Sequence, residues 1–151
     1  MRMWNIDPVL LCARHLRGEH NEMHMFEGSI KKGINVSGYI RDNLLDTSML
    51  RQRHDALAIE MLRRGGNHSS TMQYVDTINR GMVDVMASLR ELCYRCPDCR
   101  VRILQANVLP KGSIPVSINY SSVAYDHARK KNRKLTKAQF IATLPILAEA
   151  C

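Results

Sequence analysis

The stretch PVLLCARHLRGEHNEMHMFEG, residues 8–28, carries the pattern that decides the fold. Asp7 and Pro8 form a helix start, because Asp is a favoured N-cap residue and Pro fits the first helical position. Apolar residues then recur at helical spacing as far as Phe26, and Gly28 is a favourable stop. The sequence therefore predicts a helix from about residue 8 to about residue 26.

One side of this predicted helix combines ionisable and apolar side chains. Steps of 100° per residue place its members within about 80° of arc; they are Leu11, His15, Glu19, Glu22 and Phe26. Carboxylates and an imidazole beside apolar groups are costly to bury unless they are paired or face a cleft. The plain alternative is a solvated face on which Glu19 pairs with His15. The pattern otherwise favours acid–base chemistry or, as a second option, a metal held by His15, Glu19 and Glu22.

Two further helices are predicted downstream, after a segment 30–45 that is mainly loop with a short helical turn. Asp46 or Thr47 caps a helix that ends at the basic pair of RRGG, residues 63–66, as expected for a helix carboxyl end. A second apolar pattern of helical period runs from about Met72 to Leu92. These patterns indicate a helical protein.

The last third of the chain is less regular. Pro97 interrupts the sequence before a short helical stretch over 101–104, and residues 109–123 predict an irregular excursion or an edge hairpin. A capping box at Thr136 begins a final helix that Pro145 bends or ends. The sequence thus predicts an all-α single domain over residues 1–151, with a loop-rich third quarter, a helical core in 1–104 and a basic extension in 105–151.

The composition favours a polyanionic partner. The formal net charge is +8 and the isoelectric point is about 9.5, which suits nucleic acid or an anionic membrane surface. A basic protein without such a partner is the alternative. The sequence has no apolar run long enough for a signal peptide or a membrane span, and its five cysteines are an odd number. We therefore expect a reduced compartment, the cytoplasm or a host cell's cytoplasm if the protein is viral.

The cysteines Cys93, Cys96 and Cys99 form the main metal-like pattern. A spacing of two residues suits zinc or an iron–sulfur cluster. No fourth ligand lies nearby in the sequence, so buried thiols on a helix turn are the alternative. We expect no metal and no cofactor, and a cysteine-bound metal stays open as another interpretation.

Two basic groups predict contacts with DNA phosphates. The first is the run HARKKNRK, which supplies Arg129, Lys130, Lys131, Arg133 and Lys134. It would bind without sequence preference and weaken steeply with salt, although a solvated loop is equally consistent. The second comprises Arg63, Arg64 and His68, at the end of the predicted helix.

Two motifs resemble one family. The pattern His15-Leu16-x-x-Glu19-x-x-Glu22, close to Arg2, is similar to a helix of the phage pyrimidine-dimer DNA glycosylases and their bacterial relatives. The stretch RQRHDALAIEMLRRGGNH, residues 51–68, resembles their later helix, which ends in a basic pair, Gly, any residue and Asn. Together the motifs cover about the first 70 residues. Members of this family are small, helical, basic repair enzymes.

The resemblance implies imine chemistry at the amino terminus. In this family the α-amine of the first mature residue attacks the sugar C1′, a role that falls on Met1, and we expect Met1 to be retained because Arg2 is bulky. An α-amine titrates near neutrality, so a useful fraction is nucleophilic. Glu22 matches the catalytic carboxylate, while Arg2, His15 and Glu19 match supporting positions.

The resemblance further implies glycosylase and AP-lyase activity on double-stranded DNA with damaged or abasic sites, by a monomer that flips a nucleotide out of the helix. The chain departs from the family at Asn21 and Met25, where arginines are expected, and it lacks the aromatic, basic tail of the phage enzymes. These departures concern dimer specificity more than imine chemistry. A non-enzymatic DNA-binding module on the same scaffold is the alternative.

Overall fold

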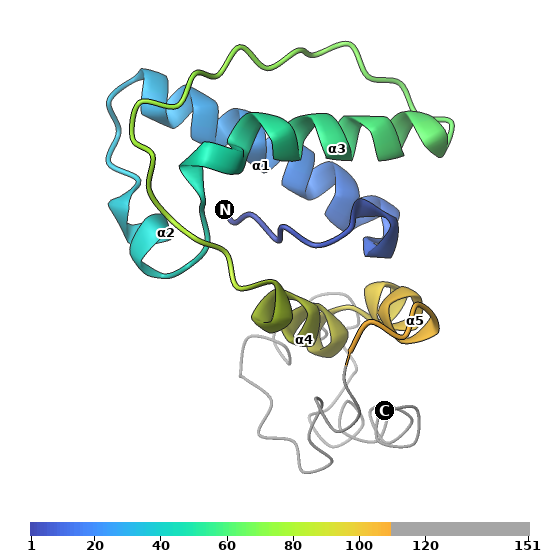
Figure 1. Ribbon diagram of the computed structural model, residues 1–151. Coiled ribbons are helices and arrows are strands. Elements are labelled where there is room, and N and C mark those ends of the chain that lie inside the picture. The colour runs from blue at the N-terminus through green and yellow to red at the C-terminus, as the bar shows by residue number, and fades with distance from the viewer. Residues whose placement is uncertain (110–151) are drawn as a thin grey trace, which may run out of the picture. The chain divides into compact units, whose positions relative to one another are not determined.

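The computed structural model describes residues 1–109, which form helices joined by extended segments (Figure 1). In this part of the chain there is no strand, only an isolated bridge between Asp46 and Gly81. The predicted all-α fold is therefore confirmed. The chain divides into two compact units, Met1–Ser88 and a unit that begins at Leu89; the assignment of residues 1–151 to one domain stays a prediction.

The first predicted helix is divided in two. Asp7 caps a single 3-10 turn, η1 (Pro8–Leu10), by accepting a hydrogen bond from the Val9 amide. The α-helix proper, α1 (Ala13–Lys31), begins only after Cys12, so the predicted start at residue 8 is wrong. The predicted stop at Gly28 is also wrong: the helix continues to Lys31, and Gly33, with φ of +68°, provides the left-handed turn that ends it.

The second predicted helix is confirmed. After the short helix α2 (Ser37–Arg41), Asp46 caps a 3-10 turn, η2 (Thr47–Met49), which leads directly into α3 (Leu50–Arg63). Gly65 follows with φ of +80°, the conformation expected after a helix end.

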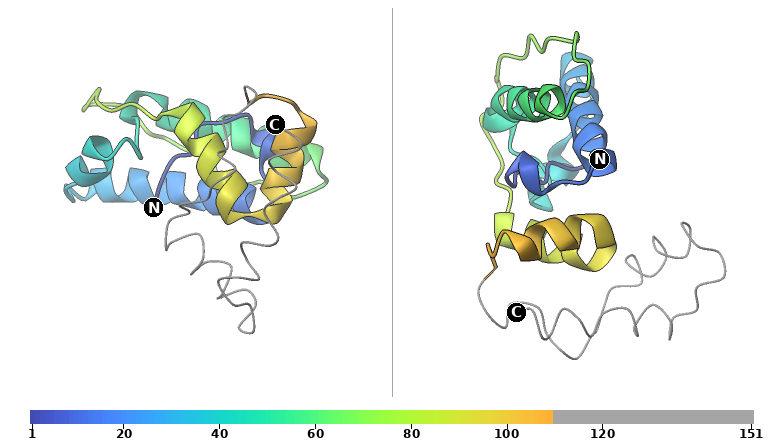
Figure 2. Two further views of the ribbon diagram at one scale, coloured as in Figure 1. Left: turned by 90° about the horizontal axis from the view of Figure 1, so that it is seen from below. Right: turned by 90° about the vertical axis from the view of Figure 1, so that its right-hand side faces the viewer.

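α1 and α3 pack against each other and form the centre of the amino-terminal unit (Figures 1 and 2). The two helices contribute fully buried aliphatic, methionine and phenylalanine side chains to the core: Met23, Phe26, Leu50 and Leu57. Met3 and Leu11 of the amino-terminal segment are buried as well. This packing holds the first residues of the chain close to α1.

The predicted helix over 72–92 is wrong for its first half. The segment that follows α3 runs in an extended conformation to residue 84, and its buried side chains alternate with exposed ones, as Met72 and Tyr74 show. Val75, which the helical pattern placed inside, is 77% exposed. The Gln73 amide donates to Glu27 of α1, so contacts with the helices decide the path of this segment.

Asp76 and Thr47 explain why this segment does not form a helix. The Asp76 carboxylate accepts hydrogen bonds from the Ile78 and Asn79 amides and from the Tyr74 hydroxyl, while Thr47 Oγ1 accepts from the Arg80 amide at 3.0 Å. Gly81 then adopts φ of +109°, and a Cβ there would lie 2.1 Å from the Leu45 carbonyl oxygen. Long-range contacts thus override the local helical pattern.

Two shorter helices complete the described residues. α4 (Val85–Arg95) is the second half of the predicted helix, and α5 (Pro97–Gln105) begins with Pro97 at its first turn. α5 contains the predicted helical stretch 101–104. In residues 1–109 no helix is long and apolar enough to cross a membrane. The predictions for 109–123 beyond Leu109, and for the helix at Thr136, lie outside the described residues.

Candidate active site at the amino terminus

The first six residues form an extended segment that lies against α1 and α3. Met3, Trp4 and Ile6 are buried, and the Met3 amide donates to the Leu44 carbonyl at 2.7 Å. The backbone of this segment is held by side chains from both helices. Its position therefore depends on the fold rather than on local sequence.

Glu22 holds the backbone beside the terminal amine. The Arg2 amide donates to Glu22 Oε2 at 2.9 Å. Consecutive backbone nitrogens lie at most about 3.7 Å apart, so the Met1 amine lies within about 6.6 Å of this carboxylate. Met1 and Glu22 are both partly exposed. The geometry therefore brings the two predicted catalytic groups, the Met1 amine and the Glu22 carboxylate, into one solvent-accessible place.

Glu19, one turn earlier on α1, has a different environment. It is 1% exposed, and its carboxylate accepts hydrogen bonds from the Trp4 and Asn5 amides at 2.6 and 3.2 Å. Arg53 of α3 adds a bidentate ion pair, with Nε and Nη2 at 2.9 and 2.6 Å from the two oxygens. Because four N–H donors occupy this carboxylate, it does not fit the metal site considered for His15, Glu19 and Glu22.

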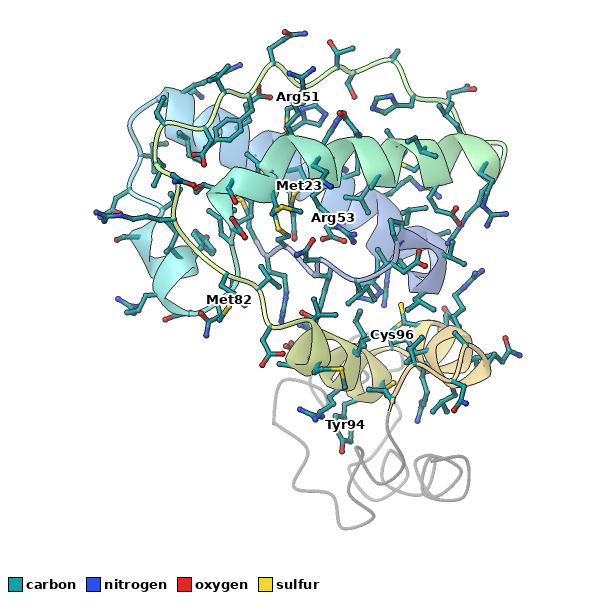
Figure 3. All side chains as sticks on the ribbon, viewed as in Figure 1. Met23, Arg51, Arg53, Met82, Tyr94 and Cys96 are labelled. Carbon is teal, nitrogen blue, oxygen red and sulfur yellow. The ribbon has the colours of Figure 1, made fainter. Side chains whose placement is uncertain are left out.

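Arg53 also binds the amino-terminal segment directly. Its Nη1 donates to the Ile6 carbonyl, and Figure 3 shows the side chain pointing from α3 toward that segment. A buried charge pair is stable only when both members have their hydrogen bonds satisfied. Glu19 and Arg53 thus form one clamp that fixes residues 4–6; Arg53 is a site residue that the sequence analysis missed.

Arg2 and His15 both contact Trp4. The Arg2 guanidinium carbon lies 3.8 Å from the ring centroid, a cation–π contact. The His15 ring meets the same indole edge-on with centroids 5.9 Å apart, and His15 Nδ1 lies 3.2 Å from Cys12 Sγ. Both predicted supporting residues therefore belong to the surroundings of the amino terminus.

The predicted phosphate contacts at the end of α3 differ in their surroundings. Glu60 forms ion pairs with both arginines, and the hydrogen bond from Arg63, then that from Arg64, lowers the pKa of the Glu60 carboxyl to about 2. Arg64 also donates to the Leu11, Pro8 and Val9 carbonyls at 2.8 to 3.1 Å. Arg63 has a side chain that is 61% exposed. These contacts give Arg64 a structural role, whereas Arg63 faces solvent.

His68 lies among other histidines rather than on an open basic surface. Its Nε2 lies 3.4 Å from Nε2 of His54, and its ring packs edge-on against that of His20. The spacing of His20 and His24 on α1 was visible in the sequence, but only the fold brings His54 and His68 to them.

The remaining predicted residues come from the carboxyl-terminal part of the chain. Cys93, Cys96 and Cys99 are buried in α4, at the N-cap of α5 and in α5 respectively. The basic run comprising Arg129, Lys130, Lys131, Arg133 and Lys134 lies outside the described residues.

The fold and site define a helical protein that holds its own amino terminus against a carboxylate. Residues 1–74 match the family model described as pyrimidine dimer DNA glycosylase, which supports the family that the two motifs indicated. No curated protein and no solved structure matches the chain.

Proposed function

We propose that this chain is a DNA glycosylase with AP-lyase activity and that the Met1 α-amine is its nucleophile. The family match supports the reaction class. The observation that carries the chemistry is the hydrogen bond from the Arg2 amide to Glu22, because it keeps the terminal amine next to a partly exposed carboxylate. General acid–base catalysis needs this proximity.

The reaction begins with the neutral amine attacking C1′ of the damaged nucleotide. The glycosidic bond breaks, its electron pair leaves with the base, and the base takes up a proton. The C1′–O4′ bond then breaks with its electron pair on O4′, and O4′ takes up the remaining amine proton, which leaves an imine between Met1 and the ring-opened sugar. Glu22 carries protons in these steps. It then removes a proton from C2′, the C3′–O bond breaks with its electrons on the departing phosphate, and water hydrolyses the imine to free the enzyme.

The clamp made of Glu19 and Arg53 positions the nucleophile in this proposal. A terminal amine on a flexible chain would reach C1′ in many orientations, whereas a segment tied at residues 4–6 presents it in few. Arg2 lies over Trp4, next to the amine, where it can bind a DNA phosphate.

The charge distribution supports binding of double-stranded DNA mainly through the carboxyl-terminal residues. Residues 1–88 contain 11 basic and 10 acidic side chains, a net of +1, whereas residues 89–151 contain 11 and 4, a net of +7. Replacing the five basic residues of 129–134 by glutamine should weaken binding to undamaged duplex and reduce the slope of log K against log salt by up to about 4. A slope that stays the same would exclude this run as a phosphate-binding region.

The decisive test is borohydride trapping on duplex DNA with an abasic site. Reduction of the imine should link the chain to DNA covalently, with Met1 as the modified residue in a peptide map. A variant with a short amino-terminal extension should bind DNA with unchanged affinity and give no adduct. Absence of any adduct, together with DNA binding that Glu22→Gln leaves unchanged, would identify a non-enzymatic DNA-binding module instead. An adduct at a lysine would disprove the role of Met1.

A further inference from the structure

Four histidines of the amino-terminal unit gather at one place that the proposed DNA chemistry does not use. His20 and His24 come from α1, His54 comes from α3, and His68 comes from the segment that follows α3. Ring centroids of His20 lie 4.7 Å from His54 and 4.9 Å from His68. Positions 20 and 22 on α1 are 200° apart, so this cluster and Glu22 lie on nearly opposite sides of the helix.

The spacing of the ring nitrogens suits a metal ion. His20, His54 and His68 each offer a nitrogen, and the three nitrogens lie within 4.8 Å of one another. Two nitrogens bound to Zn²⁺ at about 2.05 Å with tetrahedral geometry are about 3.3 Å apart. The observed distance between Nε2 of His54 and Nε2 of His68 is 3.4 Å. A small movement of His20 would complete a three-nitrogen site.

The hydrogen bonds around the cluster leave a nitrogen available. His20 is 4% exposed, and its buried Nε2 has no hydrogen-bond partner within residues 1–109, which is costly for a polar atom. His54 Nδ1 lies 2.8 Å from an oxygen of Asp55. This contact matches the carboxylate that usually orients a metal-bound histidine through its second nitrogen.

We propose that His20, His54 and His68 bind one divalent transition-metal ion of the zinc class. Three imidazole ligands favour zinc and similar metals over calcium or magnesium, which prefer oxygen ligands. His24, whose buried Nε2 likewise has no hydrogen-bond partner in the described part of the chain, packs against the rings of His20 and His54. The ion would connect α1, α3 and the extended segment that follows α3, and would thus stabilise the unit that holds the active site.

The first test is titration of the metal-free, full-length protein with Co²⁺ and with Zn²⁺. One equivalent of Co²⁺ should give visible absorption bands of a low-symmetry nitrogen site, without the near-ultraviolet charge-transfer bands of thiolate ligands. Either metal should raise the Tm by at least about 5 °C. No binding, or a spectrum dominated by thiolate bands, would overturn the proposal.

Variants assign the ligands. His68 is only partly buried, so His68→Gln should fold normally and lose both the Co²⁺ bands and the rise in Tm. Asp55→Asn should weaken metal binding about 10- to 100-fold, because it removes the group that orients His54. Asp42→Asn, which changes an exposed carboxylate at the end of α2, is the matched control for Asp55→Asn and should bind as the parent does. Unchanged binding in His68→Gln would contradict the site.

Discussion

Glu19 and Glu22 lie one turn apart on α1, but their surroundings differ in every respect that matters for chemistry. Glu19 is buried and occupied by four N–H donors. Glu22 is partly exposed and is bound to the Arg2 amide next to the chain's first residue. The comparison teaches that one helix face can supply both a buried, fully occupied carboxylate and an accessible one, and that the donors around each carboxylate decide which it is.

The largest effect is expected from Glu22→Gln. The amide keeps the size of the side chain and can still accept from the Arg2 amide, but it cannot carry a proton between sugar and solvent. Strand cleavage at abasic sites should fall about 10²- to 10⁴-fold, with little change in Tm. Asp42→Asn removes an exposed carboxylate from the end of α2 and should retain full activity. Full activity in Glu22→Gln would contradict a role of the Glu22 carboxylate in proton transfer.

Arg53→Met should instead act on stability. Removing one member of a buried ion pair leaves the Glu19 carboxylate uncompensated, so we expect a loss of about 3–5 kcal/mol in the free energy of unfolding. Chemical denaturation with urea measures this loss. Arg51→Met, two residues earlier on the exposed side of α3, is the matched control and should lie within about 0.5 kcal/mol of the parent. If the two variants are equally stable, the clamp does not hold the segment.

The arginine pair at the end of α3 offers a smaller comparison of the same kind. Arg64→Met removes the donors for three carbonyls of the segment 8–11, and it should cost about 1–3 kcal/mol. Arg63→Met should cost little stability, because its side chain is exposed, and should weaken DNA binding if the side chain contacts phosphate. Thermal melts measure the loss of stability, and binding to duplex DNA measures the loss of affinity. A loss of stability in Arg63→Met with none in Arg64→Met would contradict the structural role of Arg64.

The pH dependence of Glu60 tests the ion pairs at the end of α3. Its pKa is lowered from 4.5 to about 2 in the folded protein, so the folded state binds the proton less readily than the unfolded state does. The stabilisation is fully present above about pH 4.5 and is lost as the pH falls toward 2. The difference in unfolding free energy between the parent and Glu60→Gln should therefore shrink over this range, and a constant difference would contradict the ion pairs with Arg63 and Arg64.

Several features of the fold and site follow from local sequence. Asp7 and Asp46 were recognisable as caps because their side chains bond to amides two residues later. The end of α3 was recognisable from its basic pair and Gly65. The two motifs that point to the family are also contiguous stretches. Each of these signals depends on residues close together in the chain.

The conformation of residues 72–84 and the different roles of Arg63 and Arg64 could not be predicted from local sequence. Residues 72–84 have apolar side chains at helical spacing, yet they do not form a helix. The Arg80 amide donates to Thr47, and Gly81 packs against the Leu45 carbonyl, so contacts with residues 45–47 decide the conformation. The sequence likewise showed Arg63 and Arg64 as an equivalent pair, and only their partners distinguish them.

The sequence by itself determined the all-α class, the caps, the end of α3 and the family of residues 1–74, because these depend on short-range bonding and periodicity. The tertiary structure alone decided that Glu19 is clamped while Glu22 remains accessible, and that His54 and His68 meet His20. The physical reason is that burial and hydrogen-bond satisfaction are set by residues distant in the chain, and no local pattern records which distant donors will arrive.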